Sequence, residues 1–351
     1  NIAVDKSGNV LATYLEVSTN KPRLFAARSS DGGSSFSSPV QISQPSETLS
    51  GIGGPVTFDS TGAAYVVYSD LAVSLPTINL AIASDGRRFS TPKVVSDPSI
   101  TAFGANLAVD RKDNLYVTFY NRDLTFPSFS REVMLIRSSD KGSSFRRQIN
   151  TSNNVGESSL PFLILGKSDE VNLVWQDTED EDQGDAFLAR STDGGIAFTE
   201  PVNLSANSGV SSFVTGAADA NGNIVVAWTD DSTANTEVLS LGLTGLPAPT
   251  ADFALVLNPT EVLIRRGSSA TVGVFISRPG GFAGNVTVTA PDVAPLKIKL
   301  KGGDTKSTNG EFVSFKFKVK GGAPTAFYQL SFTARDDAGR MRSATLSLLI
   351  F

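Results

Sequence analysis

The sequence contains neither cysteine nor histidine. Without cysteine, the chain has no disulfides, thiolate nucleophiles or thiolate metal sites. Without histidine, it has no Ser-His-Asp arrangement and no imidazole metal ligand, so any chemistry depends on carboxylates, Tyr, Lys or Arg. No apolar run approaches the roughly 18 residues of a membrane span, so we expect a chain that does not cross a membrane.

Charge is distributed unevenly along the 351 residues. Residues 1–250 hold 17 Lys+Arg and 28 Asp+Glu, whereas residues 251–351 hold 13 and 7. The segment 242–250 between them is uncharged and rich in Gly and Pro, as is typical of a domain boundary. We therefore predict two domains, residues 1–245 and 251–351. The acidic first domain argues against nucleic acid as a partner.

The first 250 residues contain a repeat of about 53 residues. Four turns, here called the Ser/Asp turns, share a pattern that ends in Phe: Ser29 to Phe36, Ser84 to Phe89, Ser138 to Phe145 and Ser191 to Phe198. Their acidic residues are Asp31, Asp85, Asp140 and Asp193, which are 54, 55 and 53 residues apart. A second repeated segment occurs five times, beginning at residues 5, 59, 110, 166 and 219. The sequence therefore has five repeats, and the last lacks a Ser/Asp turn.

Each repeat consists of short Val/Ile/Tyr/Phe-rich runs separated by Gly/Asn/Asp turns, which favours small antiparallel sheets. The second repeat predicts four strands, over residues 54–58, 64–68, 78–83 and 92–96. A four-stranded sheet cannot bury both faces alone, and radial stacking around an axis solves this problem. We predict an all-β fold that begins with a β-propeller, in which either five or six blades close the ring.

The Ser/Asp turns have a structural rationale. An Asp in a tight hairpin accepts hydrogen bonds from the turn's own N–H groups, Gly supplies a positive φ, and the aromatic residue anchors the turn. Three turns match S-x-D-x-G-x-x-F in full, and over roughly residues 1–240 the sequence resembles the sialidase-like Asp-box (BNR-repeat) propellers. We expect structural roles for the four Asp residues. Many Asp-box proteins are not sialidases, so the resemblance indicates a fold more than an activity.

Sialidases, as this resemblance implies, use three arginines, a Tyr nucleophile assisted by a Glu, and an Asp acid/base. The present chain has no Arg-Ile-Pro segment near its start, and its last repeat has neither Tyr nor Arg. Arg28, Arg137 and Arg190 recur just before three Ser/Asp turns, in equivalent positions of different repeats. Such repetition is typical of structural arginines. We therefore predict no catalytic residues, with a sialidase-type glycoside hydrolase as the alternative.

The resemblance also implies that ligand sites lie on the rim opposite the Ser/Asp turns. Every repeat places an acid or amide there, two residues after an aromatic. The acids and amides are Glu16, Asp70, Asn121, Asp177 and Asp230, and the aromatics are Tyr14, Tyr68, Phe119, Trp175 and Trp228. One interpretation is that each acid caps its own loop. The other is a ligand-binding ring, with Trp175 and Trp228 as platforms for a sugar, a peptide or a cation.

Two loops beyond this ring are the least repetitive. The third carries Arg122 and Arg131, which we add to the candidate ligand-binding residues. The fourth, residues 177–185, has six carboxylates in nine residues, and Ca²⁺ favours such oxygen ligands. The weak candidate ligands are Asp177, Glu179, Asp180 and Asp182. Their spacing is not that of a known calcium loop, so we favour a solvated acidic loop and a protein that requires no cofactor.

From residue 251 the pattern changes to seven or eight alternating strands in about 100 residues, which is typical of an immunoglobulin-like sandwich. This region resembles the Ig-like modules of bacterial surface and secreted proteins. Two rows of lysines alternate on strand faces: Lys297, Lys299 and Lys301, and Lys316, Lys318 and Lys320. They indicate either protection of an edge strand or a basic patch for the acidic propeller or an anionic surface polymer.

Three functions remain open. The first is an extracellular, periplasmic or cell-surface binding protein whose propeller recognises a glycan or a cell-surface protein, with the sandwich as spacer or anchor. The second is the sialidase-type hydrolase, and the third is an interaction scaffold without a small ligand. We expect the first, and no cleavage of sialosides.

Overall fold

The computed structural model of the protein describes residues 1–17, 21–49, 54–71, 75–122, 131–146, 148–152, 156–180, 183–233, 235–244, 253–258, 261–278 and 282–351. The chain divides into two compact units, Asn1–Leu246 and Pro247–Phe351. Within the described residues, no helix has the length and hydrophobicity needed to cross a membrane.

The first unit consists of five antiparallel sheets, each built from consecutive strands and here called blades 1 to 5. Blade 1 contains β1 (Ile2–Val4), β2 (Val10–Glu16), β3 (Arg23–Ser29) and β4 (Val40–Gln41), and blade 2 contains β5 (Val56–Phe58), β6 (Ala64–Asp70), β7 (Thr77–Ala83) and β8 (Lys93–Val94). Blade 3 contains β9 (Thr101–Val109), β10 (Leu115–Arg122), β11 (Arg131–Ser138) and β12 (Ile149–Asn150), and blade 4 contains β13 (Ser159–Leu165), β14 (Val171–Asp180), β15 (Gln183–Ser191) and β16 (Val202–Asn203). Blade 5 has three strands among the described residues, β17 (Ser211–Ala218), β18 (Ile224–Asp230) and β19 (Glu237–Leu243).

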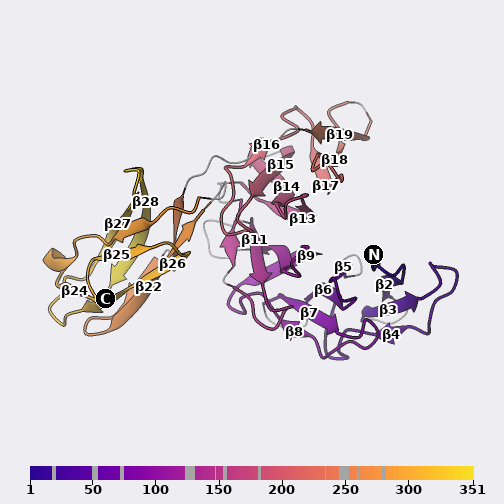
Figure 1. Cartoon of the computed structure of the whole chain (residues 1–351), viewed down its shortest axis with the longest axis horizontal. Helices are drawn as coiled ribbons and strands as arrows, with labels where there is room; N and C mark the ends of the chain where they lie inside the picture. Colours follow the sequence, from indigo (N-terminus) through magenta and orange to yellow (C-terminus); the bar gives the residue numbers. More distant parts are fainter. Residues whose placement is uncertain are drawn as a thin grey trace. The chain divides into compact units, whose positions relative to one another are not determined.

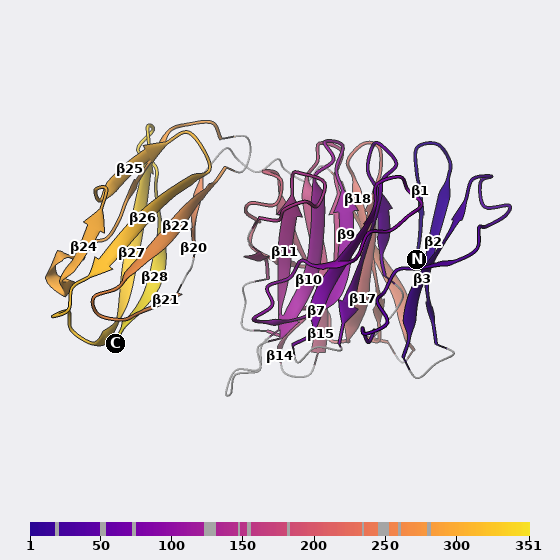
Figure 2. The ribbon, with the colours of Figure 1, turned by 90° about the horizontal axis from the view of Figure 1, so that it is seen from below.

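Neighbouring blades share apolar cores. Leu24 of blade 1 packs with Val66 of blade 2, Leu80 of blade 2 packs with Val117 of blade 3, and the pattern continues to blade 5. The first strand of each later blade contacts the blade before it. The blades follow one another in chain order along an arc, with blades 1 and 5 at its ends (Figure 1), and their strands run side by side in the perpendicular view (Figure 2). The first unit is a β-propeller.

The second unit is a sandwich of two sheets around one core. The first sheet has the order β20 (Ala254–Asn258), β22 (Ser269–Ser277), β26 (Phe312–Val319), β24 (Ile298–Lys301). The second has the order β21 (Glu261–Ile264), β28 (Met341–Ile350), β27 (Ala326–Asp336), β23 (Val286–Thr289), β25 (Thr305–Thr308). Phe315 of the first sheet packs on Phe332 of the second, with ring centroids 5.5 Å apart. A short 3₁₀ helix, η2 (Ala294–Leu296), precedes β24.

Candidate functional site

The Ser/Asp turns are closed networks of hydrogen bonds. In the first, the Ser29 hydroxyl donates to Asp31 Oδ1 at 2.6 Å and accepts the N–H of Gly33 at 2.8 Å. Ser35 donates its N–H and its hydroxyl to Asp31 at 2.9 and 2.6 Å. Gly33 has a φ of 94°, which favours glycine. These hydrogen bonds hold the pKa of Asp31 well below its usual range. The Asp31 carboxylate therefore stabilises the conformation of the turn.

The other three turns follow the same plan with one departure. Hydrogen bonds from Ser144 and Ser138 lower the pKa of Asp140 to about 2. Ser191 donates to Asp193 Oδ1 at 2.6 Å. In the second turn Ala83 stands where the others have Ser, and Asp85 accepts the N–H groups of residues 87 and 88 instead, both at 2.8 Å.

Each Ser/Asp turn after the first docks on the preceding blade through a cation. Arg28 of blade 1 donates to the Gly86 carbonyl at 2.5 Å, and Lys93 of blade 2 donates to the Ser143 carbonyl at 3.0 Å. Arg137 of blade 3 donates to the Gly194 carbonyl. These contacts place consecutive turns side by side on one rim of the propeller. They also give Arg28 and Arg137 a structural task at equivalent positions.

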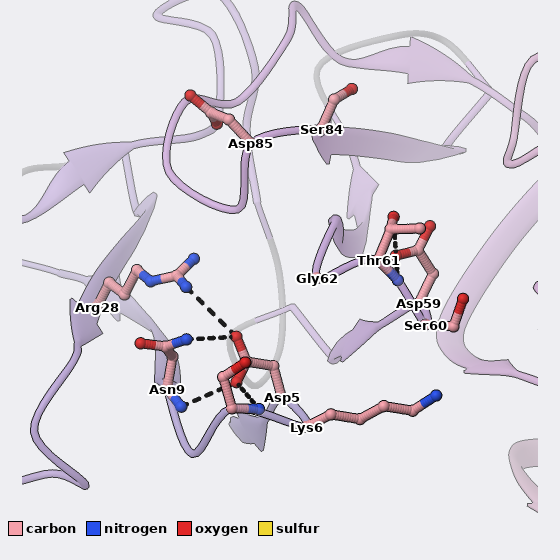
Figure 3. A pocket seen from close by; sticks show the side chains of 11 residues that line it. Asp5, Lys6, Asn9, Arg28, Asp59, Ser60, Thr61, Gly62, Ser84 and Asp85 are labelled. Carbon is pink, nitrogen blue, oxygen red and sulfur yellow. Dashed lines mark hydrogen bonds and ion pairs between the residues drawn. The ribbon is translucent and has the colours of Figure 1, made fainter.

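A polar cavity of about 250 Å³ lies on this rim, between blades 1 and 2 (Figure 3). Its charged groups are engaged with neighbours. Arg28 forms an ion pair with Asp5 at 3.3 Å, and Asp59 forms one with Lys141 at 2.9 Å. Asp5 also accepts the N–H groups of residues 7 and 9 in the turn between β1 and β2. The cavity walls thus consist largely of groups that hold the blades together.

On the opposite rim, the acids at or near the ends of the second strands of blades 2, 4 and 5, which are Asp70, Asp177 and Asp230, are buried. Asp230 is 2% exposed and accepts hydrogen bonds from Trp228 Nε1 at 3.3 Å, Asn207 Nδ2 at 2.8 Å and the Ser211 hydroxyl at 2.8 Å. Burial disfavours ionisation of Asp230, but hydrogen bonds from Asn207, Ser232 and Ser211 outweigh it and hold its pKa well below the usual range. Asp230 therefore ties the start of β17 to the end of β18.

Asp177 repeats this arrangement, whereas Asp70 binds the connection between blades 1 and 2. Asp177 accepts hydrogen bonds from Trp175 Nε1 at 2.9 Å and from the Ser158 hydroxyl. Asp70 accepts the N–H of Thr48 at 2.9 Å. Trp175 and Trp228 are 0% and 5% exposed, so neither ring offers a face for stacking in this structure. The two tryptophans therefore pack in the core and donate hydrogen bonds to the acids. A ligand-binding role for the acids stays a prediction.

The other two members of the expected ring differ. Glu16 is exposed and pairs across the hairpin with Arg23. Asn121 accepts the N–H of Glu132 at 2.9 Å, in the hairpin of β10 and β11. The acidic segment of blade 4 runs along β14 as far as Asp180, and Asp182 lies outside the described residues. In the described part of the chain, no group of three acidic residues is arranged to hold a metal ion.

One acidic residue on this rim, Glu47, was not predicted. It accepts hydrogen bonds from the Tyr68 hydroxyl at 2.8 Å, Asn79 Nδ2 at 2.8 Å and the N–H of Gln44 at 2.6 Å. Burial and the nearby Asp70 charge raise the pKa of Glu47 above its usual value. Glu47 lies in the connection between blades 1 and 2, outside the repeated segments. Self-comparison of the sequence therefore gives no signal for it.

Blade 3 continues the rim next to this group. The N–H of Ala102 donates to the Pro76 carbonyl at 2.8 Å, which joins the start of β9 to the start of β7. The Thr101 hydroxyl in turn contacts the carbonyl of Arg122 at 2.5 Å. Arg122 and Arg131 are directly opposite each other at the end of β10 and β11. Arg131 forms an ion pair with Glu157 at 3.5 Å, and the Arg122 side chain is exposed.

Arg122 and Arg131 therefore share one face at the end of a hairpin, because opposite residues of an antiparallel pair project to the same side. Like charges in this position repel each other. Guanidinium groups are well suited to hold a carboxylate or a sulfate by paired hydrogen bonds. Arg122 and Arg131 are the candidate site, on the side of blade 3 that packs against blade 4. Glu47, Tyr68, Asp70 and Asn79 form a separate polar group on the side of blade 2 that packs against blade 1.

No protein-family model matches the sequence, and no curated protein matches it. Among solved structures, the chain is similar to a Hadza microbial sialidase, with a TM-score of 0.50 and 16% identity over 80% of this chain and 63% of that one. An ulvan lyase has a TM-score of 0.49 and 10% identity, over 97% of this chain and 90% of that one. An α-L-arabinanase of Penicillium chrysogenum has a TM-score of 0.46 and 11% identity, over 98% of this chain and 91% of that one. The chain thus spans less than two thirds of the sialidase, and the likeness to that enzyme concerns the fold.

Proposed function

We propose that the protein is a binding protein of the extracellular space, periplasm or cell surface, whose propeller recognises an acidic glycan without cleaving it. The observation that carries this proposal is the pair Arg122 and Arg131, opposite each other at the rim of blade 3. An anionic sugar group placed between them would accept charge-assisted hydrogen bonds from both guanidinium groups, in competition with Glu157 for Arg131.

The acids at the same rim fit binding better than hydrolysis. Asp70, Asp177 and Asp230 are buried and hydrogen-bonded, so the carboxylates that the repeat places there stabilise the blades. A glycosidase generally needs two carboxyl groups that flank the scissile bond. The rim instead presents arginines, which suit recognition of an anionic group.

The double substitution Arg122→Ala/Arg131→Ala tests the site. We expect the unmodified protein to bind sialyllactose or a glucuronate disaccharide more tightly than lactose in isothermal titration calorimetry. The double variant should lose affinity for the acidic sugar by at least about tenfold, because each charge-assisted hydrogen bond contributes about 1.5–3 kcal/mol. Binding of lactose should change little.

A matched control removes two arginines from the opposite rim. Arg87 and Arg88 are adjacent and exposed in the second Ser/Asp turn, where Asp85 accepts their backbone N–H groups. Arg87→Ala/Arg88→Ala should bind acidic sugar like the unmodified protein. Equal losses in the two double variants, or equal affinity for lactose and the acidic sugars, would contradict the proposal.

A sialidase-type hydrolase is the second candidate, and the hydrogen bond of 2.8 Å between Tyr68 and Glu47 is the observation that favours it. Burial and the Glu47 charge raise the pKa of Tyr68, which disfavours the phenolate that a nucleophile needs. We expect no release of chromophore from an aryl sialoside by the full chain. Steady release that Tyr68→Phe abolishes would establish the hydrolase instead.

Three further features belong to this proposal. The second unit is an immunoglobulin-like module that acts as spacer or anchor, which its two-sheet sandwich supports. The number of blades that close the ring stays five or six, and the exposed side chains of Ile2 and Val4 in blade 1 and of Phe213 and Val225 in blade 5 support six. No cofactor is required, with Ca²⁺ at residues 177–182 as the alternative.

A further inference from the structure

The lysines of the second unit are concentrated in one region. All seven lie between residues 297 and 320. Four of them, here called the lysine quartet, occupy exposed positions on two neighbouring strands: Lys299 and Lys301 on β24, and Lys316 and Lys318 on β26. Lys299 is directly opposite Lys318, and Lys301 is directly opposite Lys316. The quartet therefore forms a two-by-two array of positive charge.

Protection of an edge strand does not account for this array. β24 is an edge of its sheet, but β26 lies between β22 and β24 and is paired on both sides. Lys316 and Lys318 thus stand on an interior strand. Like charges directly opposite each other across a sheet lower the stability of the fold. The arrangement has a structural cost that edge protection does not offset.

The quartet is flanked by hydroxyl groups along the strands and by two further exposed lysines, Lys297 and Lys320, at one end. On β22, Ser269 and Thr271 are opposite Lys318 and Lys316, and Ser314 precedes the lysines on β26. The exposed positions in the middle of the other sheet carry mainly neutral residues, such as Gln329, Ser331, Ser343 and Thr345. Lysine charge is therefore concentrated on one face of the sandwich, where hydroxyl groups flank it, whereas the other sheet has Arg335 and Lys306.

We propose that the lysine quartet is a binding surface for an anionic polysaccharide. Residues two apart on a strand are separated by about 6.5–7 Å, and neighbouring strands lie about 4.8 Å apart, so the four ammonium groups form a flat array. Such an array matches carboxylate or sulfate groups repeated along an extended sugar chain. Ser269, Thr271 and Ser314 supply partners for sugar hydroxyls.

The same observations disfavour nucleic acid. A flat sheet face lacks the helix or ribbon that enters a duplex groove. Single strands are usually bound by aromatic side chains interleaved with cations. No aromatic residue lies between the four lysines on their face of the sheet, because Phe317, between Lys316 and Lys318 in the sequence, is buried on the opposite face. Phe275 and Phe312, further along this face, pack on each other at 4.9 Å.

This proposal is independent of the propeller's proposed function. The rim of blade 3 would hold one anionic group of a short sugar, whereas the quartet needs charge repeated along a chain. Affinity at the quartet should therefore rise with polymer length, and it should fall as salt screens the charges. Arg122→Ala/Arg131→Ala should leave binding at the quartet unchanged.

The experiment uses the full chain with all four lysines of the quartet replaced by Gln. The probes are polygalacturonate, dextran sulfate, neutral dextran, a galacturonate dimer and duplex DNA, measured by biolayer interferometry at low and moderate salt. We expect binding of polygalacturonate or dextran sulfate, little of the dimer or neutral dextran, and a loss of at least about tenfold in the quartet variant, because four charge contacts are removed. The control replaces Lys6, Lys21, Lys112 and Lys167, four exposed lysines of the first unit, by Gln. This control variant should lose less than about threefold in affinity for the same polysaccharides.

Thermal unfolding provides a second readout. Because the quartet repels itself, the quartet variant should melt at a higher temperature than the unmodified protein at low salt. The proposal is wrong if the two lysine variants lose affinity equally, if no polyanion binds, or if DNA binds more tightly than both polysaccharides and requires the quartet. Melting at a lower temperature together with aggregation would show that the lysines protect the fold.

Discussion

Replacement of Trp175 by alanine is expected to lower the free energy of unfolding of the first unit by about 3–5 kcal/mol. The side chain is 0% exposed, stacks on Phe187 with ring centroids 6.1 Å apart, and belongs to the core between blades 3 and 4. Its removal leaves a cavity and deprives Asp177 of an indole donor. Urea unfolding followed by fluorescence measures the effect, because both tryptophans of the chain lie in the first unit and Trp228 remains as the reporter.

Two variants separate packing from the hydrogen bond. Trp175→Phe keeps an aromatic ring but removes the indole donor. It should lower the free energy of unfolding by less, about 1–2 kcal/mol. Tyr14→Ala changes the equivalent position of blade 1, which is 40% exposed, and should change stability little. If Trp175→Ala unfolds at the same urea concentration as the unmodified protein, the ring is not part of the core and a ligand platform becomes the better interpretation.

Asp230→Asn is expected to lower the free energy of unfolding by about 3 kcal/mol, because the carboxylate accepts several hydrogen bonds in a buried position. The amide that replaces one oxygen is a donor, so it faces donors from Asn207 or Ser211. Urea unfolding at neutral pH measures the difference. Glu16→Gln, at the equivalent exposed position of blade 1, should change stability little.

The difference in stability between the unmodified protein and Asp230→Asn is expected to depend on pH. The folded-state pKa of Asp230 lies below the value of about 3.9 for an unfolded Asp. Its stabilising contribution is therefore complete above about pH 5 and declines as pH falls below the unfolded pKa towards the folded one. The gap in stability between the unmodified protein and Asp230→Asn should narrow over that acidic range. A gap that is constant with pH would show that the charge of Asp230 contributes nothing.

The repeat predicts much of the first unit because each blade solves the same packing problem. In blade 2, the predicted strands 64–68 and 78–83 correspond to β6 and β7 within two residues. In the second unit, the described residues form nine strands, whereas the alternating pattern predicts seven or eight, and β25 does not follow that pattern. The β25 sequence, Thr305 to Thr308, is polar and flanked by glycines, so it lacks the apolar alternation that indicates a strand.

The candidate site was harder to predict because spacing fixes the face of a strand but not what covers that face. The aromatic and the acid two residues later do lie on one face, yet in blades 2, 4 and 5 that face is packed between blades. Glu47 is not repeated, and its role depends on a neighbour 21 residues away. A repeated signal was also overlooked. Ser43, Ser96, Ser152 and Ser205 each accept the N–H of a residue within the first four residues of the third strand.

The docking of Ser/Asp turns has a direction that bears on synthesis of the chain. The cation that receives each turn belongs to the earlier blade, as do many of the apolar residues around Phe89, Phe145 and Phe198. Phe36, whose turn has no earlier blade among the described sheets, is 45% exposed. Each blade leaving the ribosome therefore meets a partner that is already made, and assembly can proceed from the amino end without waiting for distant sequence. The propeller is therefore suited to folding one blade at a time during synthesis.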